Sequence, residues 1–242
     1  MKHKIFQWIA ILCCVLVFIT IFFICLDVIA FDRNFYREEY AKLHVAQSIP
    51  MSDEDLEKTT DVLLGYLQGK YETLEVSAQV AGQQRQVFNE REIAHMVDVK
   101  ALYQGAKTVA MVGGVLFLAM IVAGILQYRK KFLPILSRAF LWAGGVFLAV
   151  IVVILLLAVV DFSSFWTTFH KIFFRNQLWI LDPSTDILIM MVPSQFFFDL
   201  VTKIGIWYFG VMAVLTGVMI GIRRVYPKRQ TRLEASPVER NE

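Results

Sequence analysis

Long apolar runs alternate with two polar stretches along the chain, and this pattern sets the expected architecture. Four runs contain no charged residue, and each is about 19–22 residues long. As a helix, such a run is roughly 30 Å long, which matches the hydrocarbon thickness of a bilayer. The pattern therefore predicts four transmembrane helices. They are Ile5–Leu26, Thr108–Tyr128, Ala139–Val160 and Ile204–Ile222.

The polar stretch between the first two runs begins with the pattern of a helix. Ser52 followed by Asp55 is a capping pattern that predicts a helix start. Leucines at helical spacing follow, and Gly69 is the expected stop. This helix forms the first half of a small α+β domain.

The second half of this domain has the pattern of a hairpin followed by another helix. Apolar and polar residues alternate over 74–80, which predicts a half-buried strand. A turn is expected at 81–83 and a return strand at 85–88. Asn89 is the expected cap of the next helix, and Gly105 its expected end before the second span.

The other polar stretch, after the third run, is dominated by aromatic residues. Aromatic side chains recur there at helical spacing and predict a helix with a wide apolar face, lying in the lipid interface. They are Phe162, Phe165, Trp166, Phe169 and Phe173. The apolar run Ile187–Val192 is too short to span a membrane and is expected to be buried or re-entrant. Pro193 is expected to start the fourth helix.

Basic residues indicate how the chain is oriented. The N-terminus, the loop 129–138 and the tail after Ile222 hold twelve Lys and Arg residues against three acids. The stretches 27–107 and 161–203 hold twelve against eighteen acids. Because basic loops stay in the cytoplasm, both termini are predicted to be cytoplasmic and both large loops to face outward.

The expected fold class follows from these patterns. It is a membrane α-helical protein with four transmembrane helices, a small extracytoplasmic α+β domain, and an interfacial or re-entrant loop between the third and fourth helices. The predicted divisions are 1–31 for the first transmembrane helix, 32–107 for the extracytoplasmic domain, 108–128 for the second helix, 129–138 for a cytoplasmic loop, 139–160 for the third helix, 161–203 for the extracytoplasmic interfacial loop, 204–222 for the fourth helix and 223–242 for a cytoplasmic tail.

Composition removes several classes of function. The first apolar region is longer than the roughly 7–15 residues of a cleaved signal peptide, so it is expected to remain as an anchor. The net charge of +3 averages over two faces of opposite bias and indicates no nucleic-acid partner. All cysteines lie in the first helix, where they pack as small apolar residues; they are Cys13, Cys14 and Cys25. Neither a disulfide framework nor a metal or other cofactor is expected.

Two outward histidines are the candidate catalytic residues. His95 lies on the predicted helix after Asn89, and His170 lies on the aromatic helix. Each alone is typical of a packing or interfacial histidine. As a pair with suitable neighbours, they can take and give protons at neutral pH. The candidate substrate-binding neighbours are Arg91, Asp98, Trp166, Arg175, Asn176 and Trp179.

Asp98 stands one helical turn from His95 and could orient its ring. The chain contains no nucleophile elbow, zinc-protease helix motif or phosphate-binding loop. At an outer lipid interface, two histidines suit acyl transfer or ester hydrolysis on a lipid. A non-enzymatic scaffold or pH sensor is the alternative. A transporter is disfavoured because the spans hold almost no ionisable residues.

Four motifs carry a resemblance to a known family. The segments NEREIAHMVDVKALY, FHKIFF, NQLW and DILIMMVPSQFFFD, on four helices with two outer loops, resemble the lipoprotein intramolecular transacylases. The resemblance implies an enzyme that moves the sn-2 acyl chain of an S-diacylglyceryl-cysteine onto the α-amine of the same lipoprotein. The product is a lyso-form lipoprotein, and no cofactor is required. The essential histidines of the family match His95 and His170.

The resemblance also sets the expected partners and location. The substrate is a diacylated bacterial lipoprotein held among membrane lipids, with the active site facing outward from a multi-pass protein of the cell membrane. The chain alone indicates neither an oligomeric state nor which histidine acts as the base.

Overall fold

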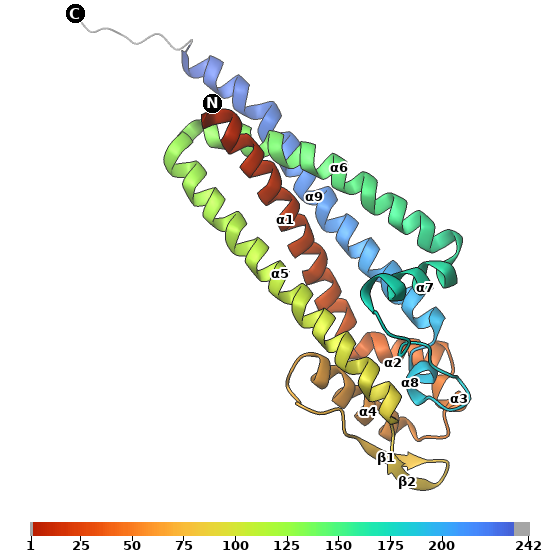
Figure 1. Cartoon of the computed structure of the whole chain (residues 1–242). Helices are drawn as coiled ribbons and strands as arrows, with labels where there is room; N and C mark the ends of the chain where they lie inside the picture. Colours follow the sequence, from red (N-terminus) through yellow and green to blue (C-terminus); the bar gives the residue numbers. More distant parts are fainter. Residues whose placement is uncertain (1, 235–242) are drawn as a thin grey trace, which may run out of the picture. The chain divides into compact units, whose positions relative to one another are not determined.

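The structure is a computed structural model that describes residues 2–234, with side chains described for residues 4–225. It is mainly helical and contains one small sheet (Figure 1). The elements are α1 (Lys2–Ala30), α2 (Arg33–Lys42), α3 (Val45–Ser48), α4 (Asp53–Leu67), β1 (Ser77–Val80), β2 (Gln83–Gln86), α5 (Glu90–Tyr128), the 3-10 turn η1 (Arg129–Lys131), α6 (Phe132–Val160), α7 (Phe162–Phe173), α8 (Ile187–Met191) and α9 (Ser194–Glu234). The tail predicted at 223–242 lies partly outside the described residues, and α9 includes its first part.

The described chain divides into two compact units, and each is considered by itself. The helical unit consists of residues 2–22, 110–154 and 206–234. The site unit consists of residues 23–109 and 155–205, and it contains both candidate histidines.

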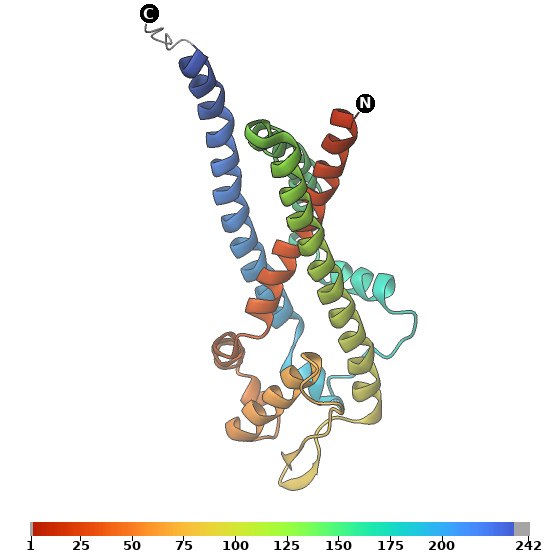
Figure 2. The ribbon, with the colours of Figure 1, turned by 90° about the vertical axis from the view of Figure 1, so that its left-hand side faces the viewer.

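Three helical stretches among the described residues are long and apolar enough to cross a membrane. They are Lys4–Ala30, Glu90–Val160 and Ser194–Val225. The second stretch contains two of the predicted spans, because α5 ends at η1 and α6 begins directly after it (Figures 1 and 2). Arg129 adopts a left-handed conformation there, with φ of 45°.

Small residues and hydroxyls join the helices of the helical unit. The Thr20 hydroxyl on α1 donates to the carbonyl of Ala110 on α5 at 2.8 Å. A Cβ on Gly113 would lie 3.2 Å from the Leu16 carbonyl oxygen, so glycine permits this close approach. The Ser137 hydroxyl on α6 likewise donates to the Met219 carbonyl on α9 at 2.8 Å. Close packing therefore accounts for the glycine at Gly113.

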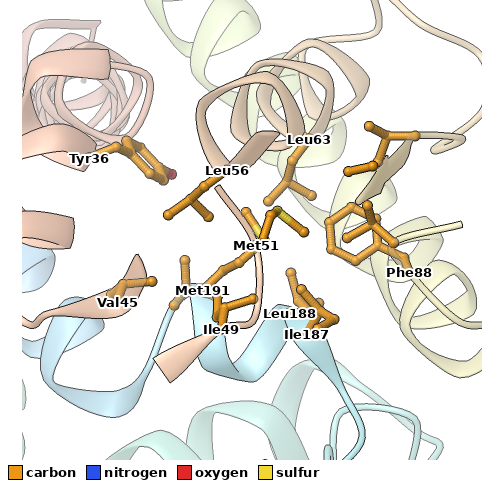
Figure 3. Packing of buried hydrophobic residues seen from close by; sticks show 14 of the residues in the cluster. Tyr36, Val45, Ile49, Met51, Leu56, Leu63, Phe88, Ile187, Leu188 and Met191 are labelled. Carbon is orange, nitrogen blue, oxygen red and sulfur yellow. The ribbon is translucent and has the colours of Figure 1, made fainter. Parts of the chain in front are cut away.

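The site unit has its own hydrophobic core, built from both large polar stretches of the sequence. Side chains of α2, α3, α4, the hairpin, α8 and the first turn of α9 form one buried cluster. Leu56 and Leu63 of α4 pack there with Ile187 and Leu188 of α8 (Figure 3). The short apolar run Ile187–Val192 is therefore buried within this core, as the sequence predicts. This shared core is what joins the two stretches that carry the histidines.

Local signals in the first polar stretch are largely confirmed. The Ser52 hydroxyl accepts from the Asp55 N–H at 3.1 Å and caps α4. Gly69 follows α4 with φ of 79°. The turn of the hairpin is shorter than expected. Val80 pairs directly with Gln83, so the loop consists of residues 81 and 82 only. Both loop residues have positive φ, as a type I′ turn requires. The return strand is therefore Gln83–Gln86 instead of 85–88, and it leads into α5 (Figure 2).

The prediction that Gly105 ends the helix after Asn89 is wrong. α5 runs without interruption from Glu90 to Tyr128. A glycine inside a helix costs about 1 kcal/mol, which is too little to end a helix held by tertiary contacts. Tyr103 donates a hydrogen bond to Asp27, and the Gln104 amide donates to the Leu67 carbonyl at 2.8 Å.

Candidate functional site

The first turn of α5 positions His95 through a reciprocal cap. The Asn89 side-chain oxygen accepts from the Glu92 N–H at 3.0 Å, and the Glu92 carboxylate accepts from the Asn89 N–H at 2.7 Å. The same carboxylate accepts from the Leu188 N–H at 2.6 Å. Glu92 is thus a structural residue that ties the start of α5 to the start of α8. His95 follows Glu92 by one turn, so the bonds of Glu92 to Asn89 and Leu188 fix the helix end that carries His95.

The aromatic face of α7 positions His170. α7 begins after Asp161, whose carboxylate accepts from the Ser164 N–H at 3.0 Å, and it spans the expected helix. Trp166 stacks on Phe162 and on Phe169, with ring centroids 5.7 and 5.3 Å away. His170 is one turn beyond Trp166. Its side chain is buried.

The tautomer of His170 follows from one hydrogen bond. Its Nδ1 lies 2.7 Å from the carbonyl oxygen of Trp166. A carbonyl oxygen can only accept, so Nδ1 carries the hydrogen in the neutral ring. The lone pair of neutral His170 is therefore on Nε2, which is the atom that can accept a proton from a substrate.

The structure brings the two predicted histidines together. Their ring centroids are 6.0 Å apart, with an angle of 35° between the ring planes. His95 is 7% exposed and His170 is 6% exposed. The Nδ1 atom of His95 is buried without a hydrogen-bond partner among the described residues. The histidine pair thus contains one buried ring nitrogen that no described protein group satisfies.

Aromatic side chains enclose this pair. The ring of Phe174 lies 5.3 Å from that of His95 and 5.5 Å from that of His170, measured between centroids. Trp166 meets the His170 ring edge-on at 4.8 Å, and Trp179 lies over it at 4.8 Å. The histidine pair consequently has an apolar wall suited to acyl chains.

This enclosure sets the charge state of both rings. Burial and, to a smaller extent, the neighbouring His170 lower the pKa of His95 to about 4, while Asp98 acts in the opposite direction. Burial also lowers the pKa of His170 below its ordinary value, although its hydrogen bond to Trp166 opposes this. Both imidazoles are therefore neutral near pH 7.

A polar segment after α7 is tied to α5 by the remaining candidates. The Asn176 amide donates to Asp98 at 2.7 Å, and its side-chain oxygen accepts from the Leu178 N–H at 3.0 Å. The Asn176 carbonyl accepts from the Trp179 indole N–H at 3.1 Å. The Arg91 guanidinium donates to the backbone carbonyl of Gln177 at 2.8 Å. These bonds hold Trp179 against His170.

The expected role of Asp98 changes at this point. The carboxylate of Asp98 binds the amide of Asn176, and among the described residues it makes no hydrogen bond to the His95 ring. Asp98 is half-buried, and its carboxylate meets the amide of Asn176 instead of the buried His95 ring. Arg175 is exposed, and within residues 4–225 no hydrogen bond or ion pair holds its guanidinium.

Sequence reasoning missed Phe174 and Phe197. Phe174 follows His170 at helical spacing within the motif FHKIFF, which is the signal that could have identified it. Phe197 packs against Trp166 with ring centroids 4.4 Å apart, and no local pattern predicts that contact. Among the described residues, no three potential metal ligands gather in one place.

Comparisons with known proteins agree on one family. The sequence profile of the family described as lipoprotein intramolecular transacylase Lit matches residues 11–197. No curated protein sequence matches the chain. The membrane-integral lipoprotein intramolecular transacylase Lit from Bacillus cereus has a similar solved structure, with a TM-score of 0.72 and 18% identity over 96% of this chain and 98% of that one.

Two variants of the Bacillus cereus protein also match. In one, a histidine is replaced by arginine, and the structures share a TM-score of 0.70. In the other, a histidine is replaced by alanine, and the TM-score is 0.68. Both are 18% identical to this chain, and the match covers 96% of each chain. The fold of the chain is therefore that of a membrane-integral protein.

Proposed function

The chain belongs to the lipoprotein intramolecular transacylase family, and from this premise we propose that His95 and His170 together catalyse its reaction. The enzyme moves the sn-2 acyl chain of a lipoprotein's S-diacylglyceryl-cysteine to the α-amine of the same cysteine. The product is the lyso-form lipoprotein. The observation that carries this assignment is the buried pair of neutral imidazoles, 6.0 Å apart within an aromatic enclosure.

The tautomer of His170 supports its role as the base. An α-amine has a pKa of about 7.7–8.0, so part of it is neutral at physiological pH. The amine nitrogen attacks the ester carbonyl carbon, and Nε2 of His170 takes a proton from that nitrogen. The new C–N bond forms as the carbonyl oxygen becomes an oxyanion.

His95 supplies the second function. The neutral His95 ring carries one N–H, and this N–H donates a hydrogen bond to the oxyanion. The bond between the carbonyl carbon and the glycerol oxygen then breaks, and the proton held by His170 passes to that oxygen. An amine and an ester become an amide and an alcohol, with no net gain or loss of protons.

The surrounding candidates bind the substrate. Trp166 and Trp179 contact the acyl chains, while Arg91, Asp98 and Asn176 hold the segment that carries Trp179. Arg175 is exposed beside them and is available to the peptide portion of the lipoprotein. Because donor and acceptor are on one molecule, proximity supplies much of the rate, and no metal or other cofactor is needed.

The proposed topology is that of a four-span protein of the cell membrane. Both termini are cytoplasmic, and the segments 32–107 and 161–203 face outward, so that the histidine pair lies at the outer leaflet. The separation of α5 from α6 by η1 supports two spans in the second apolar stretch. The charge bias of the loops supports the orientation.

The pH-sensor alternative is weakened by the same burial. Because the pKa of His95 is lowered to about 4, its charge changes outside the physiological range. Lipid ester hydrolysis uses the same residues with water in place of the amine, and the products distinguish it.

Mass spectrometry of a diacylated lipopeptide tests the proposal. The wild-type protein should convert it to an N-acyl, lyso-form product, whereas release of free fatty acid would identify a hydrolase. His95→Ala and His170→Ala should each abolish the product, and the double variant should be scarcely worse than either single one. His44→Ala is the matched control, because this exposed histidine lies outside the site. A folded His170→Ala protein with wild-type N-acyl transfer would refute the mechanism.

A further inference from the structure

A cavity that is open at the protein surface lies in the site unit, between the first turns of α7 and α9. It has a volume of about 320 Å³. Its walls are Phe162, Ser163, Ser194, Gln195 and Phe198. The mechanism described above uses none of these five side chains.

The walls combine apolar rings with hydrogen-bond donors. Phe162 and Phe198 meet edge-on, with centroids 5.5 Å apart, and form the apolar side. Within residues 4–225, the hydroxyls of Ser163 and Ser194 have no hydrogen-bond partner. A ligand that satisfies both features carries a carbonyl oxygen attached to an alkyl chain. The chemistry of the walls therefore suits a fatty-acyl ester.

The polar wall is also held in place. The Gln195 amide nitrogen donates to Asp199 at 3.1 Å, and Asp199 accepts from Lys42 at 2.7 Å. One N–H of the Gln195 amide is thus occupied, which leaves its other N–H, its side-chain oxygen and the two serine hydroxyls as the groups available to a ligand.

A line of ring contacts connects the cavity to the histidine pair. Phe162 stacks on Trp166 with centroids 5.7 Å apart, and Trp166 contacts His170 at 4.8 Å. The ester that reacts must lie within hydrogen-bond distance of His170, so it cannot occupy the cavity at the same time. A diacylglyceryl group, however, carries a second ester close to the first.

We propose that this cavity binds the acyl ester that is not transferred, and thereby decides which of the two esters reaches His170. The inference rests on the transacylase function proposed above. The two esters are chemically alike, so the histidines alone have little basis for choosing between them. With one carbonyl bound to the hydroxyls of Ser163 and Ser194 and its chain against Phe162, the glycerol has one orientation in the site.

The test uses a lipopeptide whose N-terminal S-diacylglyceryl-cysteine carries different acyl chains at its two positions. The full-length protein, in liposomes, converts this substrate, and mass spectrometry identifies which chain becomes the amide. The paired variant Ser163→Ala/Ser194→Ala removes the hydroxyls, and Ser163→Phe fills the cavity. Ser164→Phe is the matched control, because this neighbouring exposed serine does not line the cavity.

In the amide product, loss of the hydroxyls should raise the share of the acyl chain that the wild type retains on glycerol. The rise should be roughly tenfold, as expected for one or two lost hydrogen bonds. Ser163→Phe should change the share in the same direction, and Ser164→Phe should match the wild type. A chain ratio that is unchanged in both cavity variants would overturn the inference, whatever happens to the overall rate.

Photolabelling separates a failure of this inference from a failure of the proposed function. A lipopeptide with a photoreactive group on the retained chain is bound to the His95→Ala protein, which cannot turn it over. Label on peptides that contain residues 162–163 or 194–198 supports the cavity, and label confined to other peptides overturns it. A wild-type protein that forms no N-acyl product refutes the proposed function, and the labelled peptides still decide the cavity.

Discussion

Phe174 covers both imidazoles, and shortening it tests why their pKa values are low. Its ring is 7% exposed and contacts those of His95 and His170. If exclusion of water keeps both rings neutral, then Phe174→Ala should let water reach them. The pKa of each histidine should then rise toward its ordinary value of 6.5.

The size of the effect follows from the value for His95. Full rehydration would raise its pKa from about 4 to 6.5. At about pH 5.5 the neutral fraction would then fall from nearly all of the protein to roughly one tenth. Burial by the same ring also lowers the pKa of His170, and a protonated His170 cannot act as the base, so activity is lost as the pH falls through the pKa of His170. The variant should therefore lose activity at a higher pH than the wild type.

The assay is the pH dependence of kcat/KM, which reports the ionisation of the free enzyme. The substrate amine is protonated equally in both reactions, so the ratio of variant to wild type at each pH cancels its contribution. Phe173→Ala is the control, because Phe173 is half exposed and packs against Phe169, and its ring is not among those that contact the two imidazoles.

Loss of a buried ring costs about 3–5 kcal/mol of stability, so Phe174→Leu provides a milder variant with a smaller change. If folded Phe174→Ala and Phe174→Leu proteins both lose kcat/KM at the same acidic pH as the wild type, burial by Phe174 does not lower the histidine pKa values and the reasoning is refuted.

Three further predictions follow from the site unit and its surroundings. Glu92→Gln should lower the free energy of unfolding by about 1–3 kcal/mol, because the carboxylate accepts a hydrogen bond from the N–H of Leu188. A lower melting temperature in detergent would show this. Asn176→Ala should lower kcat/KM roughly tenfold, without unfolding, because it frees the segment that carries the indole over His170. Cysteines placed at Gln83 and Ser184 should react with impermeant reagents from outside only, and labelling from the cytoplasm at either position would contradict the topology.

The sequence by itself determined the features that depend on neighbouring residues. Uncharged runs of membrane length became long apolar helices, because burying an apolar helix in lipid needs no distant partner. Ser52 and Asn89 cap the helices they were expected to cap, since a cap joins groups within one turn. The aromatic helix Phe162–Phe173 also follows its periodicity.

The sequence also singled out His95 and His170, and the structure places their rings side by side. That pairing was suggested by their positions on two outward elements beside predicted spans, and the family resemblance agreed with it. It could not be read from spacing, because the residues belong to different helices far apart in the chain.

Tertiary structure alone decided the chemistry of the pair. The low pKa of each ring comes from burial by Phe174, Trp166 and Trp179, and burial is a property of the assembled site unit. Asp98 was expected to serve His95, yet it binds Asn176 from the other polar stretch. Local patterns report what a residue can do within its own helix. Which partner it meets, and whether water reaches it, depends on the packing of segments that are distant in the sequence.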